Sequence, residues 1–406
     1  TVARVARSHQ VELRLSASAR QRMEQSRAWV EEVERRGEPV VYGINTGFGS
    51  QARVVIRNDR LRELQRNLIL SHAAGVGEPL PVEVVRAAML LRANTLARGF
   101  SGVRVEVVET LLRMLEKNVV PVIPSRGSLG ASGDLAPLSH LALVLSRDPA
   151  GDVPEYSGRA YVLDETTGEW QLLSGKEAME RADIPRLVLE AKEGLALNNG
   201  TQISTALLAL ACHDARQLLK TADIAMAMTL EALLGISEAY RPEIHQARPY
   251  EGQIAIAENI RRLTEGSTLL DRHPEKVQDA YSLRCHPQVL GAVRDTLDFV
   301  EGVVQVEMNS SNDNPLIFPE LEEPKKALSG GNFHAQPVAF AADFLGIALC
   351  EIGSIAERRI FRLSDRNLNE GLPPFLSRNP GVESGLMIAQ YTAAALVSEN
   401  KSLAHP

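Results

Sequence analysis

The chain has 406 residues, of which 44% are hydrophobic and 23% are charged, and its formal net charge is −7. This apolar content can form a large core, and the mild acidic excess predicts neither a nucleic-acid partner nor an anionic membrane. Three cysteines without a CxxC pair argue against a disulfide framework and a structural zinc site. The first residues are polar, and no uninterrupted apolar run approaches the about 18 residues of a membrane span. We therefore expect a soluble, cytoplasmic protein.

The composition and the apolar pattern predict a mainly helical chain. Aromatic residues make up only 4%, whereas the helix formers Ala and Leu are abundant. The first third alternates short helices with glycine-rich loops, and residues 151–175 carry the turn and strand residues of a small hairpin. In chain order, helices are predicted at residues 59–72, 82–97, 105–117, 201–234, 287–308, 337–363 and 384–403.

The later helices are the longest ones and predict a bundle. Apolar residues recur at steps of three and four along residues 287–308, which indicates one buried helix face. Residues 201–234 contain no proline and predict a long, largely buried helix. In a bundle, sites form from side chains on facing helices and at helix ends. We divide the chain into an N-terminal part, residues 1–185, and a central helical bundle, residues 186–406.

Residues 127–135, with the sequence GSLGASGDL, are the first segment that suggests chemistry. Its glycines permit tight or left-handed backbone conformations, so an ordinary glycine loop is the common explanation. A phosphate-binding loop is a weaker explanation than an ordinary glycine loop, because no Gly-Lys-Ser/Thr follows these residues. In a third interpretation, the loop reacts with itself. The Gly133 amide nitrogen could attack the Ala131 carbonyl carbon, and two water molecules would leave, one of them carrying the Ser132 hydroxyl. The product would be an unsaturated imidazolone, an electrophile that no ordinary side chain supplies.

This run and the following Ala-Pro-Leu resemble the signature of the aromatic amino-acid ammonia-lyases, whose Ala-Ser-Gly cyclises to 4-methylideneimidazol-5-one. Further segments follow in the family's order, so the resemblance extends from about residue 11 to residue 406. They are residues 42–49, 199–201, 278–285, 312–315 and 330–334. The resemblance implies a carbon–nitrogen lyase with a mainly α fold. That fold is the long-helix bundle of the fumarase/aspartase-like superfamily with a smaller mixed N-terminal part.

The resemblance also implies the cofactor and the assembly. The electrophile would form autocatalytically from Ala131, Ser132 and Gly133, with no external cofactor and no metal. The family's sites combine segments from different subunits of a homotetramer, and the substrate is a small amino acid. Family members continue beyond the segment that matches residues 404–406, so the family's C-terminal segment is expected to be absent here.

Four residues receive roles at the site from this resemblance. Tyr42 would abstract the β-proton of the substrate as a tyrosinate, and Tyr281 matches a second tyrosine of the site. Arg284 matches the arginine that binds the substrate carboxylate, which the planar guanidinium suits. Asn199 would donate a hydrogen bond to the carbonyl oxygen of the ring. Taken singly, each could be an ordinary buried polar residue, but together, in the family's order, they predict a site.

Further positions bear on the choice of substrate. Members of the family that act on histidine resemble this chain at Ser71-His72 and at Glu399, where a carboxylate could accept an imidazole N–H. Gln278 and Phe333 are further expected substrate contacts. These residues predict deamination of L-histidine to urocanate and ammonia. Residues 309–313 resemble tyrosine lyases and aminomutases instead, so a phenylalanine/tyrosine ammonia-lyase or an aminomutase remains the alternative.

Functions from other classes are less well supported. A lyase of the fumarase/aspartase type uses a different signature loop, which the intact Ala-Ser-Gly disfavours. The nine histidines form no His-x-x-x-His pair, so a metal hydrolase is disfavoured as well. A non-catalytic scaffold stays open, because the sequence does not show whether the tripeptide cyclises.

Overall fold

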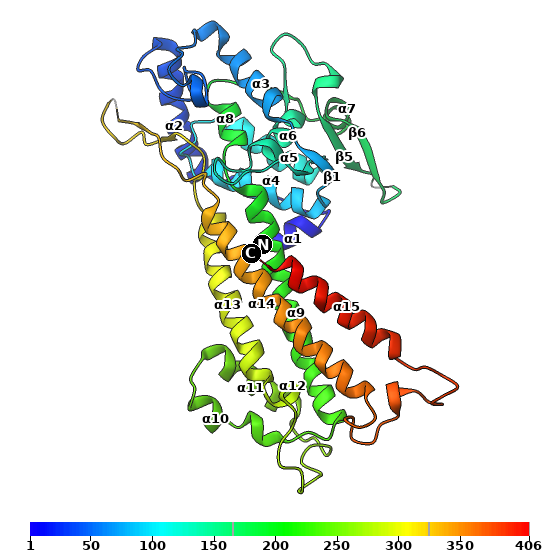
Figure 1. The fold of residues 1–406 in the computed structure, drawn as a ribbon. Coiled ribbons are helices and arrows are strands. Elements are labelled where there is room, and N and C mark those ends of the chain that lie inside the picture. Colours follow the sequence, from blue (N-terminus) through cyan, green and yellow to red (C-terminus); the bar gives the residue numbers. More distant parts are fainter. Residues whose placement is uncertain (165, 324, 406) are drawn as a thin grey trace. The chain divides into compact units, whose positions relative to one another are not determined.

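The computed structural model describes residues 1–164, 166–323 and 325–405. Helices dominate it, which confirms the mainly α prediction. The chain forms two compact units (Figure 1). Unit 1 contains Thr1–Leu210 and Val304–Ala339, and unit 2 contains Ala211–Val303 and the chain from Phe340 onward. The chain passes between the units within three long helices, α9 (Gln202–Ala232), α13 (His286–Met308) and α14 (Gln336–Ser364). The sequence-based division at residue 185 stays a prediction.

Unit 1 is built around shorter helices. They are α1 (Val2–Arg7), α2 (Ala17–Arg36), α3 (Leu61–His72), α4 (Val82–Ala97), α5 (Val105–Glu116), α6 (Leu135–Leu145), α7 (Gly175–Arg181) and α8 (Glu193–Asn198). Helix α2 is capped at its start by Ser16, whose hydroxyl accepts a hydrogen bond from the Ala19 N–H, and at its end by Gly37, which has a left-handed φ of 75°. Helix α4 is buried on nearly all sides and packs against α1 and α5 (Figure 1). The predictions for α3, α4 and α5 are confirmed.

The strands of unit 1 are short and pair locally. Strand β5 (Arg159–Leu163) pairs antiparallel with β6 (Trp170–Ser174), which confirms the predicted hairpin, and β2 (Val119–Pro121) completes this sheet. The other pairs are β1 (Val76–Pro79) with β3 (Pro124–Arg126), β4 (Ser146–Arg147) with β7 (Leu187–Val188), and β8 (Leu316–Ile317) with β9 (Ala327–Leu328). The pairing of β1 with β3 fixes the start of the glycine-rich loop, because that loop follows Arg126 directly.

Unit 2 contains the long-helix part of the chain. Its other helices are α10 (Pro242–Gln246), α11 (Glu251–Leu263), α12 (Tyr281–Arg284) and α15 (Met387–Leu403). Within this unit α9 and α13 run side by side, and the Arg216 guanidinium of α9 bonds the Glu301 carboxylate of α13 at 2.6 Å (Figure 1). The predicted helices at 201–234, 287–308, 337–363 and 384–403 are confirmed, the last of them beginning three residues later than expected. Short 3-10 helices occur at Gly49–Gln51, Asn58–Arg60, Pro154–Tyr156, Ser237–Tyr240 and Pro374–Leu376.

One helix of the described residues, α14, is long and apolar enough to cross a membrane by length and composition. Its mean hydropathy is 1.8 over an 18-residue window, of which 33% is buried inside the structure. Asp343 and Glu351 interrupt its apolar sequence. The core helix of a soluble protein passes the same test, so a single helix of this kind is weak evidence for a membrane.

A fully buried ion pair joins distant segments of unit 1. Lys192 Nζ lies 2.7 Å from Asp313 Oδ2, and both side chains are 0% exposed. The Ser101 hydroxyl donates to Asp313 Oδ1 at 2.9 Å. Because Lys192 immediately precedes α8, the pair fixes the start of that helix against the segment that carries Asp313.

Replacing Lys192 by methionine should lower the free energy of unfolding by about 3–5 kcal/mol, because the Asp313 carboxylate would stay buried without a cation. Denaturant unfolding measures this change. The matched control is Lys117→Met, since Lys117 is exposed and should tolerate the same substitution within about 0.5 kcal/mol. Equal stability of the two variants would contradict the buried pair.

Candidate active site

The glycine-rich loop holds Gly133 in a conformation and a space that only glycine fits. Its φ is +82°, and a Cβ at this position would lie 2.3 Å from the Gly200 carbonyl oxygen. Gly133 is buried, whereas Ala131 and Ser132 are exposed. The loop therefore presses the Gly133 backbone against the turn at Gly200 and presents the two preceding residues outward.

A buried carboxylate, Asp134, fixes this loop to the start of α9. Its Oδ2 accepts hydrogen bonds from the N–H groups of Ile203 and Ser204, both at 2.9 Å. Its Oδ1 accepts from the hydroxyls of Ser128 and Ser204 at 2.6 and 2.8 Å. A carboxylate at a helix N-terminus satisfies N–H groups that lack partners and interacts favourably with the helix dipole. Sequence reasoning missed Asp134, although a carboxylate directly after the Ala-Ser-Gly tripeptide was the available signal.

Asn199 is placed against the same tripeptide. Its side-chain Nδ2 donates to the Ser132 carbonyl oxygen at 2.9 Å. Its own carbonyl accepts from Arg92 Nη1 at 3.0 Å, and the same nitrogen donates to the Ala196 carbonyl at 2.9 Å. Burial lowers the pKa of the Arg92 guanidinium to about 10, which leaves it a cation at neutral pH. Arg92 was also missed, because its position within a predicted helix gives no hint of what it contacts.

Tyr42 lies in the loop that follows α2. Its hydroxyl oxygen accepts a hydrogen bond from the Gly49 N–H at 3.2 Å, and its ring meets Phe48 edge-on at 6.4 Å between centroids. Gly43 has a φ of +74°, and a Cβ there would lie 2.4 Å from the Leu195 side chain of α8. The tyrosine loop therefore packs closely on the helix that leads to Asn199.

The other two predicted residues of unit 1 are His72 and Phe333. His72 ends α3, and its Nδ1 lies 2.9 Å from the Leu68 carbonyl oxygen. The Ser71 hydroxyl lies 3.0 Å from the same nitrogen and donates to the Leu68 carbonyl at 3.0 Å. Phe333 is half-buried, two residues before Ala335, whose N–H donates to the Gly130 carbonyl at 2.9 Å. That bond ties the Phe333 segment to the glycine-rich loop.

Unit 2 carries the remaining predicted residues, and it brings two of them together. The Arg284 guanidinium carbon lies 4.6 Å from the centroid of the Tyr281 ring, and Arg284 Nε donates to the Asp279 carbonyl at 2.9 Å. Tyr281 is 72% exposed. Gln278, in the preceding loop, and Glu399, on α15, are both exposed. The structure does not group these two residues with the Arg284–Tyr281 pair, so their roles stay predictions.

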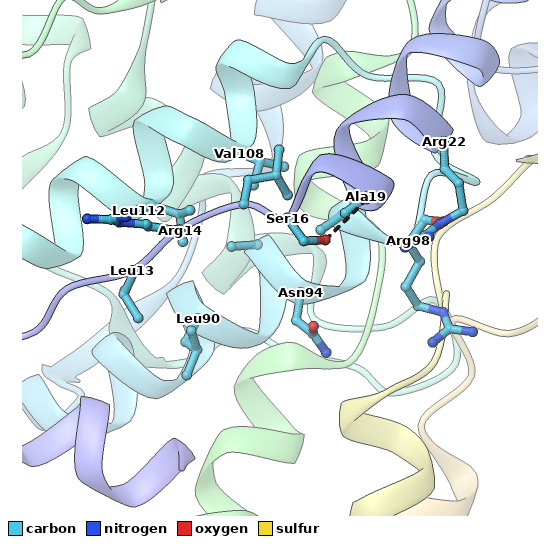
Figure 2. A pocket seen from close by; sticks show the side chains of 13 residues that line it. Leu13, Arg14, Ser16, Ala19, Arg22, Leu90, Asn94, Arg98, Val108 and Leu112 are labelled. Atoms are coloured by element: carbon cyan, nitrogen blue, oxygen red, sulfur yellow. Dashed lines mark hydrogen bonds between the residues drawn. The ribbon is translucent and has the colours of Figure 1, made fainter.

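A pocket elsewhere in unit 1 contains none of the predicted site residues. It has a volume of about 340 Å³ and lies between the start of α2, α4 and α5 (Figure 2). Its polar groups serve local structure: Arg22 Nε donates to the Arg98 carbonyl at 3.2 Å, and Asn94 Nδ2 donates to the Met308 carbonyl at 2.9 Å. We assign this pocket no role in catalysis.

Residues 1–406 match the family model described as aromatic amino acid lyase. The chain belongs to the aromatic amino acid lyase family. A histidine ammonia-lyase of Caldanaerobacter subterraneus subsp. tengcongensis is 54% identical over 396 residues, which cover 97% of this chain and 74% of that protein.

Solved structures of this family share the fold. The histidine ammonia-lyase from Trypanosoma cruzi is 40% identical with a TM-score of 0.87, and the match covers 100% of this chain and 72% of that one. The tyrosine aminomutase from Streptomyces globisporus is 38% identical with a TM-score of 0.88, and the match covers 99% and 76% of the two chains. The predicted family is thereby confirmed.

Alanine in place of Gly133 should lower the free energy of unfolding by at least about 1–3 kcal/mol, because a side chain disfavours the left-handed φ and its Cβ would collide with the Gly200 carbonyl. Chemical denaturation would measure the loss. Gly151→Ala is the control, because a Cβ at Gly151 meets nothing within 4 Å. If Gly133→Ala proved as stable as Gly151→Ala, the close approach to Gly200 would be refuted.

Proposed function

We propose that this chain deaminates L-histidine non-oxidatively to urocanate and ammonia, with an electrophile that it forms from Ala131, Ser132 and Gly133. The hydrogen bond from Asn199 to the Ser132 carbonyl oxygen carries this proposal. Curated histidine ammonia-lyases that are 48–54% identical over nearly the whole chain support the choice of substrate over phenylalanine, tyrosine or an aminomutase reaction.

The residues present fit 4-methylideneimidazol-5-one. Closure of that ring joins the Gly133 nitrogen to the Ala131 carbonyl carbon and keeps the Ser132 carbonyl oxygen, which is the atom that Asn199 binds. The missing Cβ of Gly133 lets its backbone lie against Gly200, and the exposed Ser132 would present the dehydrated carbon outward. When formed, the ring would supply the electrophile that turns the substrate amine into a better leaving group.

The side chains would bind the substrate and move its proton. The Tyr42 oxygen would take the proton from the substrate Cβ, and the Gly49 N–H that points at this oxygen stabilises negative charge on it. Arg284 Nε donates to the Asp279 carbonyl, and the two terminal nitrogens of the guanidinium would bind the substrate carboxylate as a bidentate pair.

Histidine would be selected by groups that match an imidazole. His72 Nδ1 faces the Leu68 carbonyl, so its Nε2 would be the nitrogen that contacts the substrate ring. The Glu399 carboxylate would accept the single N–H of a neutral imidazole, whereas a phenyl ring would leave that charge without a partner. Gln278 and Phe333 are proposed as further contacts with the substrate.

The proposed assembly is a homotetramer in the cytoplasm. The long helices carry large apolar side chains that are exposed in the single chain, among them Leu218 and Met228 of α9, Phe299 of α13, Phe344 of α14 and Ile388 of α15. An apolar groove of about 710 Å³ lies between α13 and α14 of unit 2. In a tetramer, a shared core of long helices would cover these surfaces. Large exposed apolar patches are typical of protein–protein interfaces.

Changing Ser132 to alanine should abolish nearly all lyase activity, because alanine has no hydroxyl to lose and cannot form the methylidene carbon. The circular dichroism spectrum should remain native. Ammonia release by the parent, by Ser132→Ala and by Ser125→Ala, an exposed serine of β3, makes the comparison. Substantial turnover by a natively folded Ser132→Ala variant would overturn the proposed electrophile.

Changing Glu399 to glutamine should lower kcat/KM for histidine by about ten- to a hundredfold, because a charge-assisted hydrogen bond is worth roughly 1.5–3 kcal/mol. The effect on phenylalanine should be small, since its ring has no N–H. Steady-state kinetics with histidine, phenylalanine and tyrosine measure both effects, with Glu258→Gln on the exposed face of α11 as the control. A parent that prefers phenylalanine or tyrosine, or an equal loss on all three substrates, speaks against the imidazole pocket.

A further inference from the structure

A buried polar network lies within unit 2, behind the segment that carries Tyr281 and Arg284. It consists of Asp223 on α9, His286 at the start of α13 and Arg359 on α14, which are 3%, 0% and 4% exposed. His286 Nε2 lies 2.8 Å from Asp223 Oδ1, and His286 Nδ1 lies 2.8 Å from Arg359 Nη2. Four helices of unit 2 are joined here, because Asn259 of α11 donates to Asp223 Oδ2 at 2.7 Å.

The partners of His286 determine the state of its ring. An arginine only donates hydrogen bonds, so Nδ1 accepts from Arg359 and the single proton of the neutral ring is on Nε2, where Asp223 accepts it. Burial lowers the pKa of His286, and the Asp223 carboxylate opposes this effect while the Arg359 cation adds to it. The neutral imidazole thus connects a carboxylate to a guanidinium and uses both of its nitrogens.

Arg359 binds His286 through Nη2 and the backbone of α12 through Nε. Its Nε donates to the Ser282 carbonyl at 2.9 Å, and the Tyr240 hydroxyl donates to the next carbonyl, that of Leu283, at 2.7 Å. Helix α12 has only four residues, and the Cys285 N–H that follows it is directed at the carbonyls of Tyr281 and Leu283. Arg359 gives the Ser282 carbonyl a side-chain donor, and Tyr240 adds a second donor to the Leu283 carbonyl.

The two bonded carbonyls lie between Tyr281 and Arg284 in the chain. A change in the direction of these peptide groups would tilt α12, and with it both side chains that project from its ends. The Arg284 side chain is held to the backbone of the preceding loop by its hydrogen bond to the Asp279 carbonyl, so a tilt of α12 against that loop would disturb it. Positioning of a bidentate carboxylate ligand tolerates little displacement.

We propose that Arg359, oriented by His286 and Asp223, is a positioning residue that holds α12 so that Arg284 receives the substrate carboxylate. This role rests on the proposed function, because it takes Arg284 as the carboxylate ligand. Loss of the orientation should weaken substrate binding and raise KM, while the tripeptide loop in unit 1 still undergoes ring closure.

The test compares His286→Leu with His286→Gln. Glutamine can accept from Arg359 through its amide oxygen and donate to Asp223 through its amide nitrogen, whereas leucine can do neither. We expect KM to rise about tenfold or more in His286→Leu and to stay within about threefold of the parent in His286→Gln. His213→Leu, at an exposed histidine of α9, is the matched control and should leave KM unchanged.

Intact mass should show the same loss of two waters in the parent and in both His286 variants. If His286→Leu fails to fold, Tyr240→Phe removes the donor to the Leu283 carbonyl at little change in shape, and it should raise KM about threefold or more. A parental KM in His286→Leu, or in Tyr240→Phe when that variant is the one available, would overturn the proposal. So would an equal rise in KM for His286→Leu and His286→Gln.

The assays use whichever of histidine, phenylalanine and tyrosine the parent deaminates fastest. A preference for phenylalanine or tyrosine would contradict the proposed substrate without changing the comparison between leucine and glutamine at position 286. The two proposals can therefore fail separately.

Discussion

The close approach of the Gly133 backbone to the Gly200 carbonyl is the constraint on which the proposed site depends. This contact requires glycine at position 133. The Asp134 N–H stabilises it by donating a hydrogen bond to the same carbonyl at 2.7 Å. The Asp134 carboxylate then binds the first turn of α9. A loop of mostly small residues gains a fixed shape in this way, because its Asp134 side chain binds the helix end beside it.

The same principle recurs in unit 2, where a helix end is completed by buried donors. Helix α12 is too short to be stable by itself, since isolated helices of a single turn lack cooperative hydrogen bonding. Arg359 and Tyr240 bind its carbonyls, and long helices hold both donors in place. Both units therefore fix the short segments that carry proposed site residues to long helices through buried polar contacts, which is the arrangement that precise positioning needs.

The sequence predicted the regular parts of this fold well. Helix α4 has the predicted bounds, because most of its residues are strong helix formers and Pro81 directly precedes its first turn. Helix α15 begins at Met387 and not at residue 384, since the residues before it form an irregular segment that the periodicity did not reveal. The family motifs predicted Tyr42, Asn199 and Arg284 as site residues, and of these three the structure places Asn199 against the tripeptide.

Buried polar partners could not be predicted in the same way. Arg92 and Arg359 stand within long apolar helices, and nothing in the local sequence tells which carbonyl each will bind. His286 follows the Arg284 motif directly, yet its two partners are separated from it by 63 and 73 residues. Such contacts depend on how helices pack, which local patterns do not specify.

The central claim, that the tripeptide becomes an electrophile, can be tested on a single peptide. Trypsin should release residues 127–147, because Arg126 and Arg147 flank a segment that contains no other Lys or Arg. Mass spectrometry of this peptide from the purified parent should show a mass lower than the encoded one by two waters, with the loss located at residues 131–133. A peptide of the full encoded mass from active enzyme would contradict the account.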